Sequence, residues 1–201
     1  MKKINSLLSI LLITVLLAAC GTTTGNEKAN QPDSEIKNAE QTEASGNTTA
    51  TKEELKGTSA KSESQNYSIT LMDGFELTGE EPNKDMLFNT ENDAQSLRIE
   101  TFDSQEVNLD EVTNNLVDIL KASNENGNLV EISDENQLPN NEGIKEVKGY
   151  QIDTPEGMVS GYTFEREGLI IKLTVFDTNE NPALDKFVKM AETIKKSASA
   201  L

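Results

Sequence analysis

The side chains that most often carry acid–base, nucleophilic or metal chemistry are scarce in this chain. Its 201 residues include no His and a single Cys, Cys20, against 35 Asp plus Glu. Without His the chain lacks the commonest general base and the commonest metal ligand, and one thiol forms neither an internal disulfide nor a Cys-rich zinc site. Residues 66–201 contain no phosphate-binding glycine loop and no Gly-x-Ser-x-Gly or Ser-x-x-Lys motif. A nucleophile would therefore have to be a Ser or Thr activated by Lys or a carboxylate, and paired carboxylates are the other candidate groups.

Two acidic stretches are the candidate cation ligands. The first, Asp177–Asn181, alternates oxygen-bearing side chains as the first half of a calcium loop does. However, Pro182 replaces the glycine that such a loop needs, and Val188 stands where its bidentate Glu should be. The second stretch is Asp134–Glu135, which could bind cations loosely. Solvated surface and a strand-to-helix loop are the simpler interpretations, so we expect no catalytic, cofactor-binding or metal-binding residue and no cofactor.

The N-terminus carries the most specific pattern in the sequence. Lys2 and Lys3 precede the apolar stretch Ile4–Leu17, which has the length of a signal-peptide core and is too short to span a bilayer. The stretch ends in Leu17-Ala-Ala-Cys20. This ending resembles the lipobox of bacterial lipoproteins, in which an aliphatic residue and two small residues precede the Cys that receives a lipid.

The resemblance implies cleavage between Ala19 and Cys20 and a diacylglyceryl group on the Cys20 thiol. Two acyl chains suffice for firm anchoring, where one does not. The chain would then be a lipoprotein on the extracytoplasmic face of the cell membrane, and Gly21 together with the Lys-, Asn- and Glu-rich composition favours a Gram-positive location. An ordinary secretory signal that happens to end in Cys, and a retained signal anchor, are the alternatives.

Composition divides the rest of the chain into a tether and a domain. Residues 20–65 contain no aromatic residue and few apolar ones, and such a segment cannot offset its ordering entropy, which predicts a disordered tether after the signal peptide of residues 1–19. Residues 66–201 hold all nine aromatic residues and form the predicted folded domain. Its 27 acidic and 11 basic residues exclude a nucleic-acid binder and disfavour contact with anionic lipid heads.

Hydrophobic periodicity assigns elements within this domain. Alternation of apolar and polar residues predicts strands in the following ranges: 67–71, 75–78, 86–89, 97–102, 129–132, 144–152, 158–165 and 169–176. Turn signals at Asp73-Gly74 and in residues 154–157 separate neighbouring strands, so the last three ranges form a meander. Residues 79–83 and 133–143 are predicted loops, because both contain Pro and Gly.

Two amphipathic helices complete the pattern. The first begins after Asn108 as N-cap and ends at residues 124–127; its apolar face comprises Leu109, Val112, Leu116, Ile119 and Leu120. The second is predicted to begin with Asn181 as cap and Pro182 in the first turn, with Lys195 and Lys196 in its last turn. Its buried face comprises Leu184, Phe187, Val188, Ala191 and Ile194.

The order of elements predicts an α+β fold with a largely antiparallel sheet and two helices packed on it. Over residues 66–197 the pattern is similar to that of PsbP-like domains, on the strand led by Tyr67, the Asp73-Gly-Phe75 turn, the helix after Asn108, the meander and the C-terminal helix. This topological resemblance implies a non-enzymatic binding or assembly module. Its partner would be another envelope protein or a small ligand, while a carboxylate-dependent cell-envelope hydrolase and a low-affinity cation binder are the alternatives.

Overall fold

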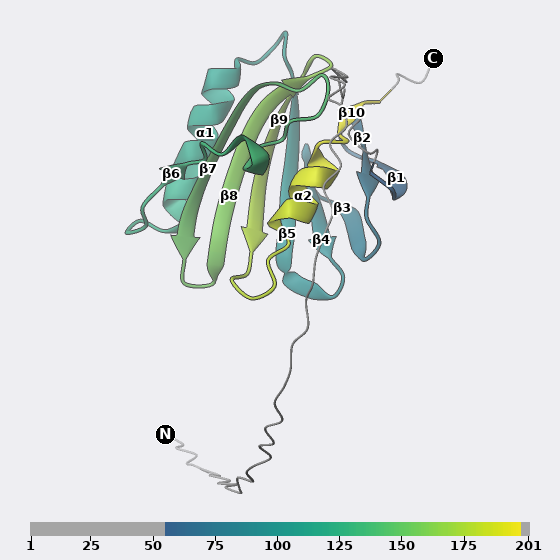
Figure 1. Ribbon diagram of the computed structural model, residues 1–201. Coiled ribbons are helices and arrows are strands. Elements are labelled where there is room, and N and C mark those ends of the chain that lie inside the picture. The colour runs from purple at the N-terminus through teal and green to yellow at the C-terminus, as the bar shows by residue number, and fades with distance from the viewer. Residues whose placement is uncertain (1–54, 198–201) are drawn as a thin grey trace, which may run out of the picture. The chain divides into compact units, whose positions relative to one another are not determined.

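The computed structural model describes residues 55–197, and the described part contains ten strands and two α-helices (Figure 1). The predicted signal peptide, with Ala19 and Cys20, and most of the predicted tether lie outside the described residues. The strands are β1 Thr58–Lys61, β2 Tyr67–Leu71, β3 Phe75–Glu81, β4 Lys84–Asn89, β5 Asn92–Asp103, β6 Val130–Glu131, β7 Lys145–Thr154, β8 Gly157–Arg166, β9 Leu169–Asp177 and β10 Lys195–Lys196. The helices are α1 Leu109–Ser123, a short 3-10 helix at Glu135–Gln137 and α2 Leu184–Ala191.

The larger sheet has seven antiparallel strands in the order β3-β4-β5-β9-β8-β7-β6. Its β7–β8–β9 meander and its β4–β5 hairpin confirm the predicted neighbours. The pairing of β5 with β9, which aligns Leu97 with Val175 and Ile99 with Leu173, joins the two halves of the chain. The predicted α+β class with a largely antiparallel sheet is therefore confirmed.

The two helices pack on opposite faces of this sheet (Figure 1). A side chain at Gly161 of β8 would point at Leu116 and Leu120 of α1. The next residue, Tyr162, belongs instead to the apolar cluster that contains Phe187 of α2. Because successive strand residues point to opposite faces, α1 and α2 sandwich the sheet between them.

The first helix agrees with its prediction, whereas the second begins and ends differently. The side chain of Asn108 accepts a hydrogen bond from the Asp110 amide, as an N-cap does. Helix α2, however, begins at Leu184 after Ala183, not at Asn181 and Pro182. Its end at Ala191 leaves Lys195 and Lys196 in a strand and not in the last helical turn.

A smaller sheet has the order β1-β2-β10, and its central strand β2 contacts α2. The sequence had placed residues 58–65 in the tether and had made β2 and β3 successive strands around one turn. In the structure β1 pairs with β2 along its whole length, and β10 pairs with the other side of β2. The ordered domain therefore begins before Asn66, since backbone pairing in β1 needs no apolar side chains.

Most of the core lies between the large sheet and the layer formed by α2 and the small sheet. Phe75 of β3 meets Phe187 of α2 edge to face, with ring centroids 5.4 Å apart. The predicted loop at residues 79–83 is shorter than expected, because β3 continues to Glu81 and β4 starts at Lys84. Within residues 55–197 no helix has the length and apolar character needed to cross a membrane.

Candidate binding site

The two acidic stretches singled out from the sequence have structural roles in this fold. The carboxylate of Asp177, at the end of β9, accepts hydrogen bonds from the backbone amides of Thr178, Ala183 and Leu184. It thereby caps the start of α2 from outside the helix. Asp134 accepts a hydrogen bond from the Asn136 amide and caps the short 3-10 helix. The strand-to-helix interpretation of Asp177–Asn181 thus describes the geometry of that loop.

Gln95 is the buried partner of Asp177. Its side-chain amide donates to the Asp177 carboxylate at 2.9 Å, to the Thr178 hydroxyl and to the Asn181 carbonyl, while its oxygen accepts from Asn89. Gln95 is 2 % exposed and lies on β5, so it ties the β4–β5 hairpin to the loop before α2. Both polar atoms of the Gln95 side chain have partners, as buried polar groups require.

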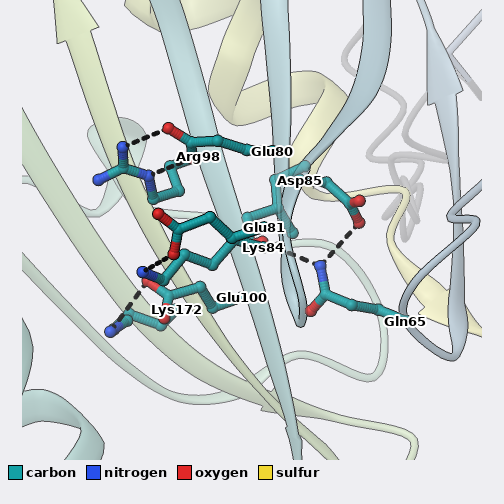
Figure 2. A network of polar contacts seen from close by, with 9 residues as sticks. Gln65, Glu80, Glu81, Lys84, Asp85, Arg98, Glu100 and Lys172 are labelled. Carbon is teal, nitrogen blue, oxygen red and sulfur yellow. Dashed lines mark hydrogen bonds and ion pairs between the residues drawn. The ribbon is translucent and has the colours of Figure 1, made fainter.

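Charged side chains line the part of the large sheet that α1 leaves uncovered, over β3, β4 and β5 (Figure 2). Arg98 makes two hydrogen bonds to the Glu80 carboxylate, at 2.7 and 2.8 Å. These bonds hold the pKa of Glu80 below its usual value. Lys84 pairs with Glu81 across the β3–β4 turn at 2.9 Å. Each pair is exposed or half-buried, so each contributes little to stability.

A buried ion pair borders this surface where α1 begins to cover it. Lys172 of β9 and Glu100 of β5 face each other at 3.0 Å, with their side chains 5 % and 12 % exposed. The Lys172 ammonium also donates to the side-chain oxygen of Asn115 in α1. Because both charges have partners, this pair fixes α1 against the sheet and leaves no free group for chemistry.

Asp85 is the centre of a second polar cluster, on the opposite face of the sheet. Asp85 lies two residues before the buried Leu87 on β4, so both side chains point to the same face of the sheet, toward the small sheet. The Asp85 residue is 1 % exposed. The Tyr67 hydroxyl donates to Oδ2 of Asp85 at 2.8 Å, and the Gln65 amide donates to the same oxygen at 2.7 Å. The Ser64 hydroxyl donates to Oδ1 at 3.2 Å. Burial and the Asp85 carboxylate raise the pKa of Tyr67 well above its usual value.

Neighbouring strands and turns hold these donors in place. The Gln65 side-chain oxygen accepts from the Thr101 amide at 2.7 Å, and its nitrogen also donates to the Ile99 carbonyl. Both contacts fix the orientation of the Gln65 amide, whose nitrogen must therefore face Asp85 (Figure 2). The Ser62 hydroxyl accepts from the amides of Ser64 and Gln65 and shapes the turn that carries them.

A cavity of about 140 Å³ opens beside Asp85, between the small sheet and β3. Its walls are formed by Ala60, Lys61, Ser62, Glu63, Leu77, Thr78, Gly79 and Asp85. A Cβ added at Gly79 would lie 3.9 Å from Asp85 Oδ1, so this oxygen is the one nearest the glycine at the cavity wall. A buried carboxylate at the wall of a small cavity can accept a hydrogen-bond donor or a cation from outside.

Sequence reasoning did not identify Asp85, Ser64 or Gln65 as site residues. Four of the eight wall residues and two of the three donors to Asp85 lie before residue 66, in the segment assigned to the tether. One usable signal was present: Asp85 takes an inward position two residues before the apolar Leu87. Ala19 and Cys20, the lipid-attachment residues expected from the sequence, lie outside the described residues.

The architecture and the polar clusters define an antiparallel α+β domain whose interior carboxylates are held by neighbouring donors. A scan against protein-family models and a search of curated proteins give no match. Among solved structures, the chain is similar to cyanobacterial PsbP (CyanoP) from Synechocystis sp. PCC 6803, with 12 % identity and a TM-score of 0.46, over 69 % of this chain and 91 % of that protein.

A second similar structure is a protein from Bacteroides thetaiotaomicron VPI-5482. It shares 10 % identity and a TM-score of 0.41 over 72 % of this chain. The match spans 50 % of the length of that protein, so the chain corresponds to about half of it. The fold class stated above depends on the strand order and helix placement of this chain itself.

Proposed function

We propose that this chain is a non-enzymatic binding or assembly module, anchored by a lipid on Cys20 at the extracytoplasmic face of the cell membrane. The observation that carries the proposal is the ending Leu17-Ala-Ala-Cys20 after a short basic start and an apolar stretch. The thiol of Cys20 is the only one in the sequence, so lipid attachment has a single possible site. The partner would be another envelope protein or a small ligand.

The state of the buried carboxylates supports a binding role over a catalytic one. Asp85, Asp177 and Glu100 each accept hydrogen bonds or an ion pair from fixed neighbours, and Glu192 accepts from the Asn140 amide at 2.9 Å. A carboxylate hydrolase needs one group free to give a proton and a second free to attack or to activate water. Groups committed to structural partners serve that chemistry poorly.

The anchor is tested by Cys20→Ser in the full-length chain. The wild-type protein is expected in the membrane fraction with incorporated radioactive palmitate, and the variant is expected to lose the label and leave that fraction or remain uncleaved. Thr22→Ala, two residues beyond the lipid site, is the matched control and should behave as wild type. Label retained by Cys20→Ser would overturn the anchor.

A further inference from the structure

We infer that the cavity beside Asp85 binds a primary ammonium group, carried by a small alkylamine or by the end of a lysine side chain. The inference rests on the proposed binding role, but it does not depend on the lipid anchor at Cys20. Its basis is a buried carboxylate that has hydrogen-bond donors but no cation, placed at the wall of a cavity of matching size.

Three side-chain hydrogen-bond donors converge on the Asp85 carboxylate. The Gln65 nitrogen, whose orientation is fixed by Thr101 and Ile99, can only donate. The Tyr67 and Ser64 hydroxyls also point their donors at the carboxylate. Yet within residues 55–197 no Lys or Arg lies in ion-pair distance of Asp85, although buried charges are usually paired with an opposite charge.

The hydrogen bonds to Asp85 are shared unequally between its two carboxylate oxygens. A carboxylate offers about four lone-pair positions on its two oxygens. Oδ2 receives two short hydrogen bonds, from Tyr67 and Gln65, whereas Oδ1 receives only the longer bond from Ser64 at 3.2 Å. Oδ1 is also the oxygen that faces Gly79. A donor entering from the cavity would therefore meet Oδ1.

The size and lining of the cavity favour a small primary ammonium. Its volume of about 140 Å³ is several times the roughly 10–15 Å³ in which a single water molecule fits, so the cavity has room for an ammonium group and a short alkyl chain. Ala60 and Leu77 offer apolar contact for the methylenes. Within the described residues no group of three or more His, Cys, Asp and Glu is arranged to hold a metal ion.

Besides Asp85, one acidic and one basic residue at the cavity walls contribute to the charge of the site. Glu63 is exposed there and adds to the attraction for a cation, whereas the exposed Lys61 opposes it. Lys61→Met removes this opposing charge and should therefore strengthen binding of an added ammonium.

The test is a titration of the full-length protein in detergent with methylammonium, ethylammonium and Nα-acetyl-lysine amide, followed by melting temperature and ligand-observed NMR. Saturable binding is expected for these primary ammonium ions. Tetramethylammonium, which has no N–H donor, and sodium at equal ionic strength should show none. Tighter binding of the lysine derivative than of ethylammonium would identify a lysine side chain as the natural source, and the reverse order a free amine.

Three variants give the result its specificity. Asp85→Asn removes the charge and should weaken methylammonium binding by at least about tenfold. Because Asp85→Asn can also unfold the domain, Gly79→Ala places a methyl group in front of Oδ1 while leaving all three donors in place, and it should weaken binding to a similar extent. Glu76→Gln removes an exposed carboxylate from β3, the strand that carries Gly79, and should leave methylammonium binding unchanged.

Binding that survives in folded Gly79→Ala and Asp85→Asn protein would overturn the inference, as would equal responses to methylammonium and tetramethylammonium. Saturable binding of sodium or calcium in place of ammonium would overturn it too. The anchor can fail without affecting any of these results, since its readout is the lipid on Cys20. Conversely, loss of ammonium binding leaves the anchor intact.

Discussion

The Tyr67 hydroxyl on β2 donates a 2.8 Å hydrogen bond to the Asp85 carboxylate on β4, and this bond links the small sheet to the large one. Both residues are almost fully buried, at 0 % and 1 % exposure. A hydrogen bond to a buried charged acceptor is stronger than one between neutral groups. The attachment of β1, β2 and β10 to the domain therefore depends on a polar contact as well as on apolar packing.

Replacing Tyr67 by Phe is expected to destabilise the domain by about 1.5–3 kcal/mol, because it removes a hydrogen bond to a charged group and leaves Asp85 with one fewer donor. Urea unfolding of the full-length protein measures the change. Tyr150→Phe removes the hydroxyl of a half-buried tyrosine on β7 and should change the free energy of unfolding by less than about 0.5 kcal/mol. Equal losses in the two variants would contradict a special role for the Tyr67 hydroxyl.

The raised pKa of Tyr67 predicts that the free energy of unfolding decreases at alkaline pH. In the unfolded chain this hydroxyl ionises near pH 10, whereas in the folded domain it stays protonated to higher pH. The stabilisation is therefore fully present below about pH 10 and is lost as pH rises above it. Unfolding midpoints measured across this range should fall more steeply for wild type than for Tyr67→Phe, and parallel curves would count against the prediction.

Asp177→Ala is expected to cost about 2–4 kcal/mol, since it removes the cap of α2 and leaves the buried Gln95 amide without its charged acceptor. Thermal or urea unfolding measures the loss. Glu180→Ala is the matched control, because it removes an exposed acidic side chain from the same loop and keeps the backbone. The control should lie within about 0.5 kcal/mol of wild type. A loss of unfolding free energy in Asp177→Ala as small as that of the control would show that α2 forms without this cap.

Gly161→Ala tests the close approach of α1 to the sheet. The added methyl carbon would lie 2.7 Å from a Leu116 methyl and 2.9 Å from a Leu120 methyl, both fully buried. Such overpacking costs about 1–3 kcal/mol. Gly79→Ala is the matched control, because the added methyl carbon would lie 3.9 Å from its nearest neighbour, Oδ1 of Asp85, and the unfolding free energy should change by less than about 0.5 kcal/mol.

Local patterns in the sequence predicted the elements that depend on local physics. Helix α1 was predicted with its N-cap at Asn108, because capping and a one-sided apolar stripe involve residues only a few positions apart. The β7–β8–β9 meander was predicted from period-two alternation and its two tight turns for the same reason. Both signals are complete within short windows of sequence.

The segment before Asn66 shows where such windows fail. Its polar composition predicts disorder, yet β1 forms in it with exposed and half-buried residues only. The stabilisation comes from backbone hydrogen bonds to β2, and a backbone donor or acceptor is the same for every non-proline residue. The predicted start of α2 was wrong for a related reason. The first helical amides are capped by Asp177, which lies outside the helix, and not by Asn181.

By itself, therefore, the sequence determined the acidic composition, the lipobox-like ending at Cys20, and the types of most elements. Only the tertiary structure decided that β5 pairs with β9, that the helices lie on opposite faces, and that Ser64, Gln65 and Tyr67 converge on Asp85. These relations join residues between about twenty and eighty positions apart. Local sequence patterns do not specify which distant strand pairs with the edge of another strand, or which buried carboxylate lies at the wall of a cavity. Both depend on the packing of the whole domain.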